Sequence, residues 1–139
     1  MERPAMIRFT VRRSKRGPVE VAHVYRPGGG KIFQARIERS TLTAFLDRLG
    51  VEYSRSKTGK TIYLTGRDPE DTLRKLVVFA GCRQCVRSQA KVLDLAQAVA
   101  GMGELETIFW FSKMLEAYEA RGFWGACRVA RAVRALHGI

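Results

Sequence analysis

The chain has 139 residues, of which 46% are hydrophobic and 27% are charged, and 25 basic against 13 acidic residues give it a formal net charge of +12. These numbers are typical of one folded domain with its own core, and no apolar run approaches the ~20 residues that a bilayer requires. The first residues contain no apolar stretch or cleavage site of a secretory signal, so we expect a cytoplasmic protein without a membrane partner.

The positive charge is concentrated in the first half of the sequence. Residues 1–66 hold 14 Lys and Arg against 5 Asp and Glu, whereas residues 67–139 hold 11 against 8. Such an excess is typical of a surface that binds a polyanion. The alternative is a generally basic surface of a thermophilic protein, and the absence of Asn together with only four Gln favours a thermophilic source.

The first half is predicted to form strands. A period-2 alternation of apolar and polar side chains opens the chain, in the order Ile7, Arg8, Phe9, Thr10, Val11 and Arg12. After a basic loop, residues 19–26 and 31–38 flank a glycine-rich turn and predict a hairpin. In its second arm Phe33 shares a face with Ala35 and Ile37, which indicates a core position.

A short amphipathic helix is predicted next, with Ser40 as its N-cap and Gly50 just after its end. Residues 51–56 and 60–66 then flank the turn signal Lys57-Thr-Gly59 and predict a second hairpin. Its aliphatic side should meet the helix. We therefore expect Tyr53, Arg55 and Tyr63 on the open side of the sheet.

The remainder is predicted to be helical. Asp68-Pro69 begins a helix that should end at Gly81, and residues 86–100, 104–121 and a final segment after Gly122 complete a four-helix part. The fold class is therefore α+β, with a small antiparallel sheet of about five strands, a short helix and a helical C-terminal part. We expect one domain, 1–139, in which residues 1–66 form the basic β-rich part and residues 67–139 the helical part.

Catalytic motifs are missing from the sequence. It contains no G-x-S-x-G, H-E-x-x-H or complete Walker A pattern, and Gly28-Gly-Gly30-Lys31 and Thr58-Gly59-Lys60-Thr61 fit hairpin turns better than phosphate loops. We therefore expect no enzyme and no cofactor. Cys82, Cys85 and Cys127 leave two interpretations open, namely buried residues with one disulfide, or a zinc site completed by a histidine.

Nucleic-acid binding is better supported, because a basic surface that also carries aromatic rings can hold phosphates and stack bases. The predicted nucleic-acid-binding residues are Arg8, Arg12, Lys31, Arg36, Tyr53, Arg55, Lys57, Lys60 and Tyr63. The preferred partner is single-stranded DNA, bound without sequence preference. An RNA-binding module using the same face, and a helical interaction subunit with a merely basic surface, remain as alternatives.

Large apolar residues are concentrated between positions 109 and 124. They are Phe109, Trp110, Phe111, Met114, Tyr118, Phe123 and Trp124. The helix predicted over residues 104–121 is apolar around much of its circumference, and a surplus apolar face is typical of a dimer interface. We therefore expect a homodimer that forms through the helical part.

In its order of elements the chain resembles ThermoDBP and its relatives, which are single-stranded-DNA-binding proteins of thermophilic archaea. The likeness lies in a basic, aromatic sheet with a short helix, followed by a helical C-terminal part, and in the types of side chain at Tyr53, Arg55 and Tyr63. The resemblance implies sequence-independent binding of single strands and C-terminal dimerisation. The sequence departs from the family in lacking a long heptad pattern, since glycines interrupt its C-terminal helices.

Overall fold

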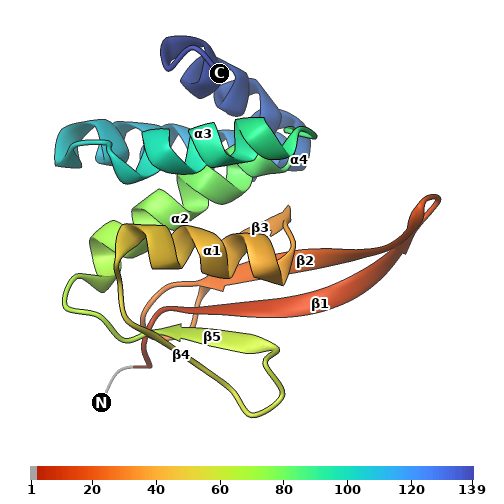
Figure 1. Ribbon diagram of the computed structural model, residues 1–139, viewed down its shortest axis with the longest axis vertical. Coiled ribbons are helices and arrows are strands. Elements are labelled where there is room, and N and C mark those ends of the chain that lie inside the picture. Colours follow the sequence, from red (N-terminus) through yellow and green to blue (C-terminus); the bar gives the residue numbers. More distant parts are fainter. Residues whose placement is uncertain (1–2) are drawn as a thin grey trace. The chain divides into compact units, whose positions relative to one another are not determined.

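The computed structural model describes residues 3–139, which form one five-stranded antiparallel sheet and four helices (Figure 1). The strands are β1 (Met6–Ser14), β2 (Gly17–Tyr25), β3 (Lys31–Arg36), β4 (Tyr53–Arg55) and β5 (Thr61–Leu64), and the helices are α1 (Arg39–Leu49), α2 (Pro69–Arg83), α3 (Gln89–Ala100) and α4 (Glu104–Leu136). The predicted α+β class is confirmed. The chain divides into two compact units, one running to Leu73 and the other comprising Arg74–Ile139.

The sheet of the first unit has the strand order β3-β2-β1-β5-β4. Because directly paired residues of antiparallel strands point to the same face, the register fixes which side chains share a face. One face is apolar and buried beneath α1 (Figure 1), and its residues are Ile7, Phe9, Ala22, Val24, Phe33, Ala35, Ile62 and Leu64. The core assignment of Phe33 is therefore confirmed. We call the opposite side the open sheet face.

Helix α1 begins two residues earlier than its predicted start, and Ser40 is not its N-cap. Glu38 occupies the cap position and its side chain makes no capping bond. The backbone N–H of Arg39 instead donates to the Glu20 carboxylate from β2, which places a negative charge at the positive end of the helix dipole. Gly50 ends the helix in the left-handed conformation, with φ of 68°, as the sequence predicts.

The second unit is helical throughout. Helix α2 continues past Gly81 to Arg83, and Gly81 packs against Met114: a Cβ added at Gly81 would lie 2.6 Å from Met114 Sδ. Helix α4 is sharply broken at Gly122, where φ is 57° and ψ is −138°. Its two segments return on one another, since His137 Nε2 lies 2.9 Å from Glu106 Oε1 at the opposite end of the helix. The predicted break at Gly122 is thereby confirmed as the turn of a helical hairpin.

The apolar stripe of α4 differs from the predicted one. Helical spacing predicts an inward stripe of Leu105, Ile108, Phe111, Leu115 and Tyr118. In the structure Thr107, Trp110 and Met114 are buried, whereas Leu105 and Ile108 are exposed. A helix that is apolar on several sides does not show by periodicity which side will be covered. Among the helices of residues 3–139, none is long and apolar enough to span a membrane.

Candidate nucleic-acid interface

The open sheet face carries polar, basic and aromatic side chains in rows across the strands. One row runs Gln34, His23, Arg8 and Thr61 across β3, β2, β1 and β5. The next row runs Tyr25, Met6 and Tyr63. Two strand spacings therefore separate Tyr25 from Tyr63, or roughly 10 Å, and both rings are half-buried. Two rings thus lie beside the exposed guanidinium of Arg8 on one surface.

Further cations line the same face towards the end of the β1–β2 hairpin. Arg12 pairs with Val19, and Arg36 pairs with Val21, so both arginines belong to the open sheet face and both are exposed. The structure therefore brings together Arg8, Arg12, Arg36 and Tyr63, as the sequence predicts.

The pKa of His23 is affected by the positive charges on this surface. It is only 8% exposed, and its Nε2 lies 2.9 Å from Thr10 Oγ1. Burial lowers the pKa of His23 below its usual 6.5, and the positive charges of Lys31, Arg12 and Arg8 lower it further. Three cations therefore lie close enough to His23 to act on it, and clustered positive charge attracts a polyanion.

The prediction that Tyr53 and Arg55 share this face is wrong. Strand β4 pairs Tyr53 with Leu64 and Arg55 with Ile62, so both side chains lie on the α1 side of the sheet. Tyr53 Oη donates to Asp47 Oδ1 of α1 at 2.8 Å, and the Arg55 guanidinium lies 5.8 Å from the centre of the Tyr53 ring. The hydroxyl of Tyr53 thus links the edge strand to the helix, on the face opposite Tyr63.

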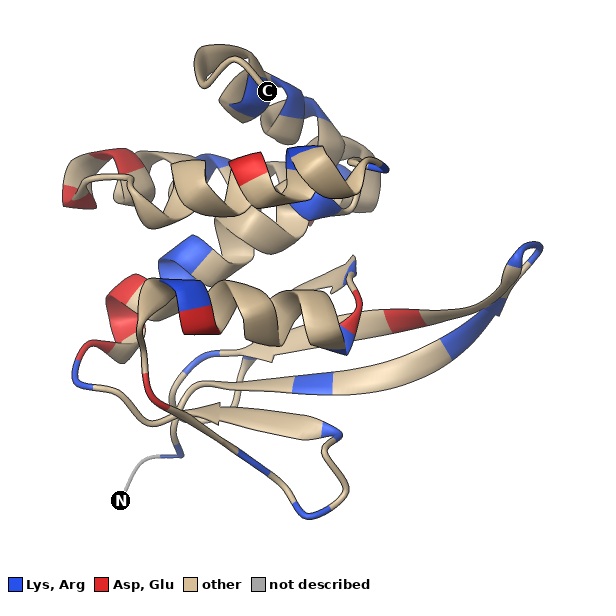
Figure 2. Ribbon diagram, viewed as in Figure 1, with Lys and Arg blue, Asp and Glu red and all other residues tan. Residues whose placement is uncertain are grey.

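The three predicted lysines lie near hairpin ends. Lys57 and Lys60 are exposed in the turn between β4 and β5, and Lys31 is exposed at the start of β3, where its Nζ donates to Gln34 Oε1 at 3.0 Å. Lys and Arg residues also lie at the tip of the β1–β2 hairpin (Figure 2). The open sheet face is therefore bordered by cations at several of its ends.

Tyr25 and His23 are members of this face that the sequence pattern did not assign. Strand β2 has buried residues on both faces, Val21 on one and Ala22 and Val24 on the other, so its alternation gives no preferred side. The pairing also shifts between Val24 and Tyr25, where the β2–β3 ladder is irregular. The signal that identifies both residues is the pairing of His23 with Arg8 and of Tyr25 with Met6.

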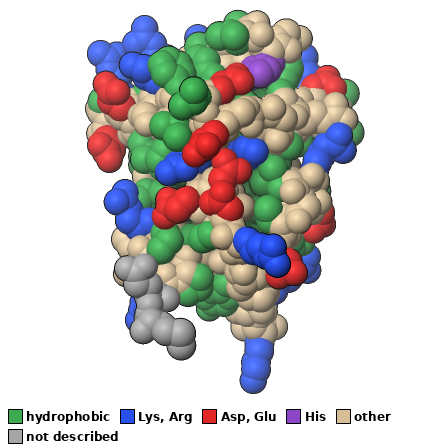
Figure 3. Space-filling view, turned by 90° about the vertical axis from the view of Figure 1, so that its left-hand side faces the viewer, with side chains coloured by type: hydrophobic (Ala, Val, Ile, Leu, Met, Phe, Trp, Pro, Cys, Tyr) green, Lys and Arg blue, Asp and Glu red, His purple; other side chains and the backbone are tan. Residues whose placement is uncertain are grey.

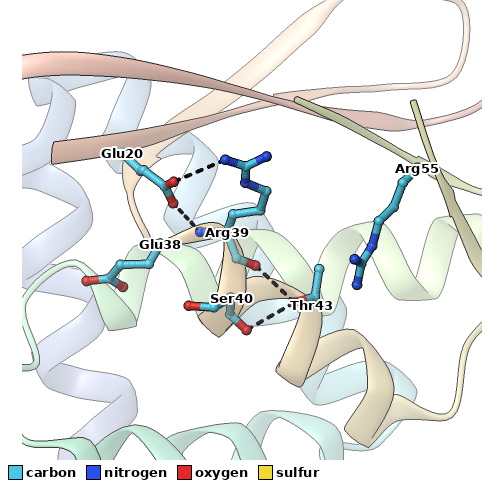
Figure 4. A pocket seen from close by; sticks show the side chains of 6 residues that line it. All are labelled: Glu20, Glu38, Arg39, Ser40, Thr43 and Arg55. Atoms are coloured by element: carbon cyan, nitrogen blue, oxygen red, sulfur yellow. Dashed lines mark hydrogen bonds and ion pairs between the residues drawn. The ribbon is translucent and has the colours of Figure 1, made fainter. Parts of the chain in front are cut away.

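An open cleft of about 610 Å³ lies on the α1 side of the sheet (Figure 4). Its lining residues are Glu20, Glu38, Arg39, Ser40, Thr43 and Arg55. Arg39 is held by an ion pair with Glu20, at 3.6 Å, and by a 2.8 Å hydrogen bond to the Gly59 carbonyl. Since its principal cation is held by these contacts and two carboxylates face the space, the cleft is a poor match for phosphate.

The cysteines form a disulfide. Cys85, just after α2, is bonded to Cys127 in the second segment of α4, and Cys82 is a buried thiol whose pKa burial raises to about 12. Between residues 3 and 139 no group of three or more His, Cys, Asp or Glu side chains could hold a metal ion. Of the two interpretations that the cysteine spacing left open, the structure has the disulfide.

No protein-family model, curated protein sequence or solved structure matches this chain.

Proposed function

We propose that the protein binds single-stranded DNA, without sequence preference, on the open sheet face. The observation that carries the proposal is the row of Tyr25 and Tyr63 next to Arg8, on the sheet face opposite α1. A single strand needs aromatic planes for its bases and cations for its phosphates, and this face provides both. The resemblance to the ThermoDBP family suggests the same activity.

The division of labour follows from the chemistry of each side chain. Tyr25 and Tyr63 are placed to stack on bases, a contact that any base can make. Arg8, Arg12 and Arg36 are exposed on the same face and are suited to phosphate contacts. Lys31, Lys57 and Lys60 lie at the strand ends and add to the attraction of the backbone at longer range.

Two tyrosines on opposite faces of the sheet provide a matched test. A fluorescent oligo-dT is titrated at low salt into the wild type, Tyr63→Ala and Tyr53→Ala. Loss of one stacked base contact costs about 1–3 kcal/mol, so we expect Tyr63→Ala to weaken binding by about tenfold. Tyr53→Ala should bind as the wild type does, because its ring lies on the α1 side.

Two results would contradict the proposal. Absence of oligo-dT binding by the wild type at low salt would exclude the function. Equal losses in the two tyrosine variants would exclude the open sheet face as the site. Competition with a matched RNA oligomer separates DNA from RNA, since only contacts to the 2′-hydroxyl distinguish the two.

We further propose that the protein is a homodimer formed by its helical unit. Leu105, Phe109 and Leu136 are 84%, 51% and 71% exposed. The contact between Glu106 and His137 brings the two ends of α4 together, so these three residues lie near the open end of the helical hairpin. We call them the end patch. Figure 3 shows hydrophobic side chains at the surface among charged ones. An exposed apolar patch of this kind can pack against the same patch of a second copy of the chain.

A further inference from the structure

Strands β1 and β2 extend beyond the rest of the sheet as a two-stranded arm. Strand β5 pairs with β1 only over Met6–Arg8, and β3 pairs with β2 only from Val21 onward. Between them, residues 11–20 pair only with each other, in four rungs from Val11–Glu20 to Ser14–Gly17. At 3.4 Å per residue the paired part is about 14 Å long, with a tight turn at its end. Figure 1 shows this arm extending from the sheet of its unit.

Beyond the Val11–Glu20 pair, the arm carries only positive charge. Residues 11–19 contain Arg12, Arg13, Lys15 and Arg16 and no acidic residue, and all four side chains are exposed. They surround the ribbon: Arg12 lies on one face, Arg13 on the other, and Lys15 and Arg16 form the turn. Figure 2 shows the basic tip. A second copy of the same arm would be repelled, whereas a polyanion with charge on both sides would be attracted.

The tip is closed by local hydrogen bonds. The Ser14 hydroxyl donates to the Gly17 carbonyl at 2.7 Å and accepts from the Arg16 N–H at 3.3 Å. Gly17 has φ of 110°, a conformation that favours glycine. The turn is therefore defined, so its cations are presented from a fixed backbone.

The base of the arm is braced by Arg39. Its guanidinium lies 6.0 Å from the centre of the Phe9 ring in β1 and makes the ion pair with Glu20 of β2. It also donates to the Gly59 carbonyl in the β4–β5 turn, and its own residue begins α1. One side chain thus links both strands at the base of the arm to the neighbouring hairpin and helix.

We propose that this arm is a second nucleic-acid site, which docks in the major groove of duplex DNA. A two-stranded ribbon is about 10 Å thick with its side chains, and the B-form major groove is about 12 Å wide and is bordered by phosphates on both sides. Cations on both faces of the arm and at its turn can reach the phosphates on both sides of the groove. A flexible single strand can follow an open surface and does not require a projecting arm. The major groove of duplex RNA is too narrow for side chains to enter, so the arm selects DNA.

The proposal is tested with a variant that removes the tip charges but leaves the open sheet face intact, namely Arg13→Gln, Lys15→Gln and Arg16→Gln. The matched control neutralises three exposed cations of the helical unit, Arg87→Gln, Lys91→Gln and Arg128→Gln, and so has the same net charge. Binding of blunt duplex DNA, duplex RNA of the same sequence and oligo-dT is measured over a range of salt concentrations. Circular dichroism confirms that each variant is folded.

We expect the tip variant to lose about tenfold or more in affinity for duplex DNA, with a salt slope smaller by up to about 2.7, and the control to lose much less. The wild type should prefer duplex DNA to duplex RNA. Equal losses in the tip and control variants, or equal affinity of the wild type for the two duplexes, would overturn the proposal. Its failure is distinct from failure of the single-strand proposal, because oligo-dT binding depends on Tyr63 and Arg8, which the tip variant retains.

Discussion

His23 lies under the cations of the open sheet face, where burial and three positive charges all oppose its protonation. The same surroundings that favour a phosphate therefore disfavour an imidazolium. The pKa of His23 therefore reflects the positive charge of the open sheet face, and it can be followed without any ligand. Its Thr10 partner keeps one ring nitrogen satisfied in the neutral state.

The lowered pKa of His23 predicts that folding stability depends on pH. In the unfolded chain the imidazole takes up a proton near pH 6.5, whereas in the folded protein protonation requires a lower pH. The free energy of unfolding should therefore be constant above about pH 7 and fall as the pH decreases below 6.5. Urea unfolding at several pH values between 5 and 8 measures the trend.

The control for this prediction is His23→Gln, which retains a polar partner for Thr10 but does not titrate. In this variant the decrease between pH 6.5 and 5 should be smaller than in the wild type. If both proteins lose the same stability over that range, His23 is not the group responsible.

At the scale of elements, the sequence predicted the strands and helices better than the relation between neighbouring strands. Alternation within each strand correctly placed Tyr53 with Arg55, and Ile62 with Leu64. Whether these two pairs share a face depends on the register between β4 and β5. Four turn residues lie between Ser56 and Thr61, and the Ser56 N–H donates to the Thr61 carbonyl. This turn pairs Arg55 with Ile62. A shift of one residue would move Tyr53 to the opposite face, and composition does not fix that shift.

Contacts between distant elements explain the other differences. The Glu20 carboxylate caps α1 from β2, so the local signal at Ser40 gave the wrong cap. Gly81 packs against Met114 within α2, so the glycine that predicted a helix end instead lies at a close contact between helices. In both cases the deciding partner is more than 15 residues away in the sequence, where local patterns carry no information.

The Cys85–Cys127 bond is predicted to stabilise the helical unit. It closes a segment with a sequence separation of 42, and a loop of that length corresponds to about 4 kcal/mol in the chain-entropy estimate. Thermal unfolding with and without a reducing agent should show a lower Tm for the reduced protein. The double variant Cys85→Ala, Cys127→Ala should unfold at a similar temperature to the reduced wild type and should not respond to the reducing agent.

Cys82→Ala is the control for the role of the disulfide itself. Its thiol is buried and forms no disulfide, so this variant should keep the response to reductant that the wild type shows. An unchanged Tm on reduction of the wild type would show that helix packing alone determines the stability of this unit.

For the whole molecule, the compact units divide the charge differently from the sequence halves. The unit that runs to Leu73 has 15 basic and 8 acidic residues, and the unit comprising Arg74–Ile139 has 10 and 5. The net charges of +7 and +5 are close, because the acidic start of α2 belongs to the first unit. Net charge alone therefore does not show which unit binds nucleic acid. The first unit differs from the second in its sheet, whose register places cations and tyrosines on one face, and in the extension of β1 and β2.

The end patch of the helical unit predicts self-association. A stable interface buries about 800 Å² on each partner and is centred on large apolar side chains, a role that Leu105, Phe109 and Leu136 can fill. Sedimentation equilibrium of the wild type between about 5 and 200 µM should give twice the chain mass of 15.7 kDa at the higher concentrations. Leu105→Glu with Leu136→Glu should shift it to the monomer.

Trp124 offers the matched control for dimerisation. It is 80% exposed, like the end patch, but it lies beside the α4 turn at Gly122, at the opposite end of the hairpin. Trp124→Gln should therefore remain dimeric. A wild-type protein that stays monomeric over the whole concentration range would contradict the proposal, and a Trp124→Gln monomer would place the interface at the turn instead. Because the open sheet face belongs to the other unit, the monomeric double variant should still bind oligo-dT through Tyr63 and Arg8, although with a lower apparent affinity where two sites engage one strand.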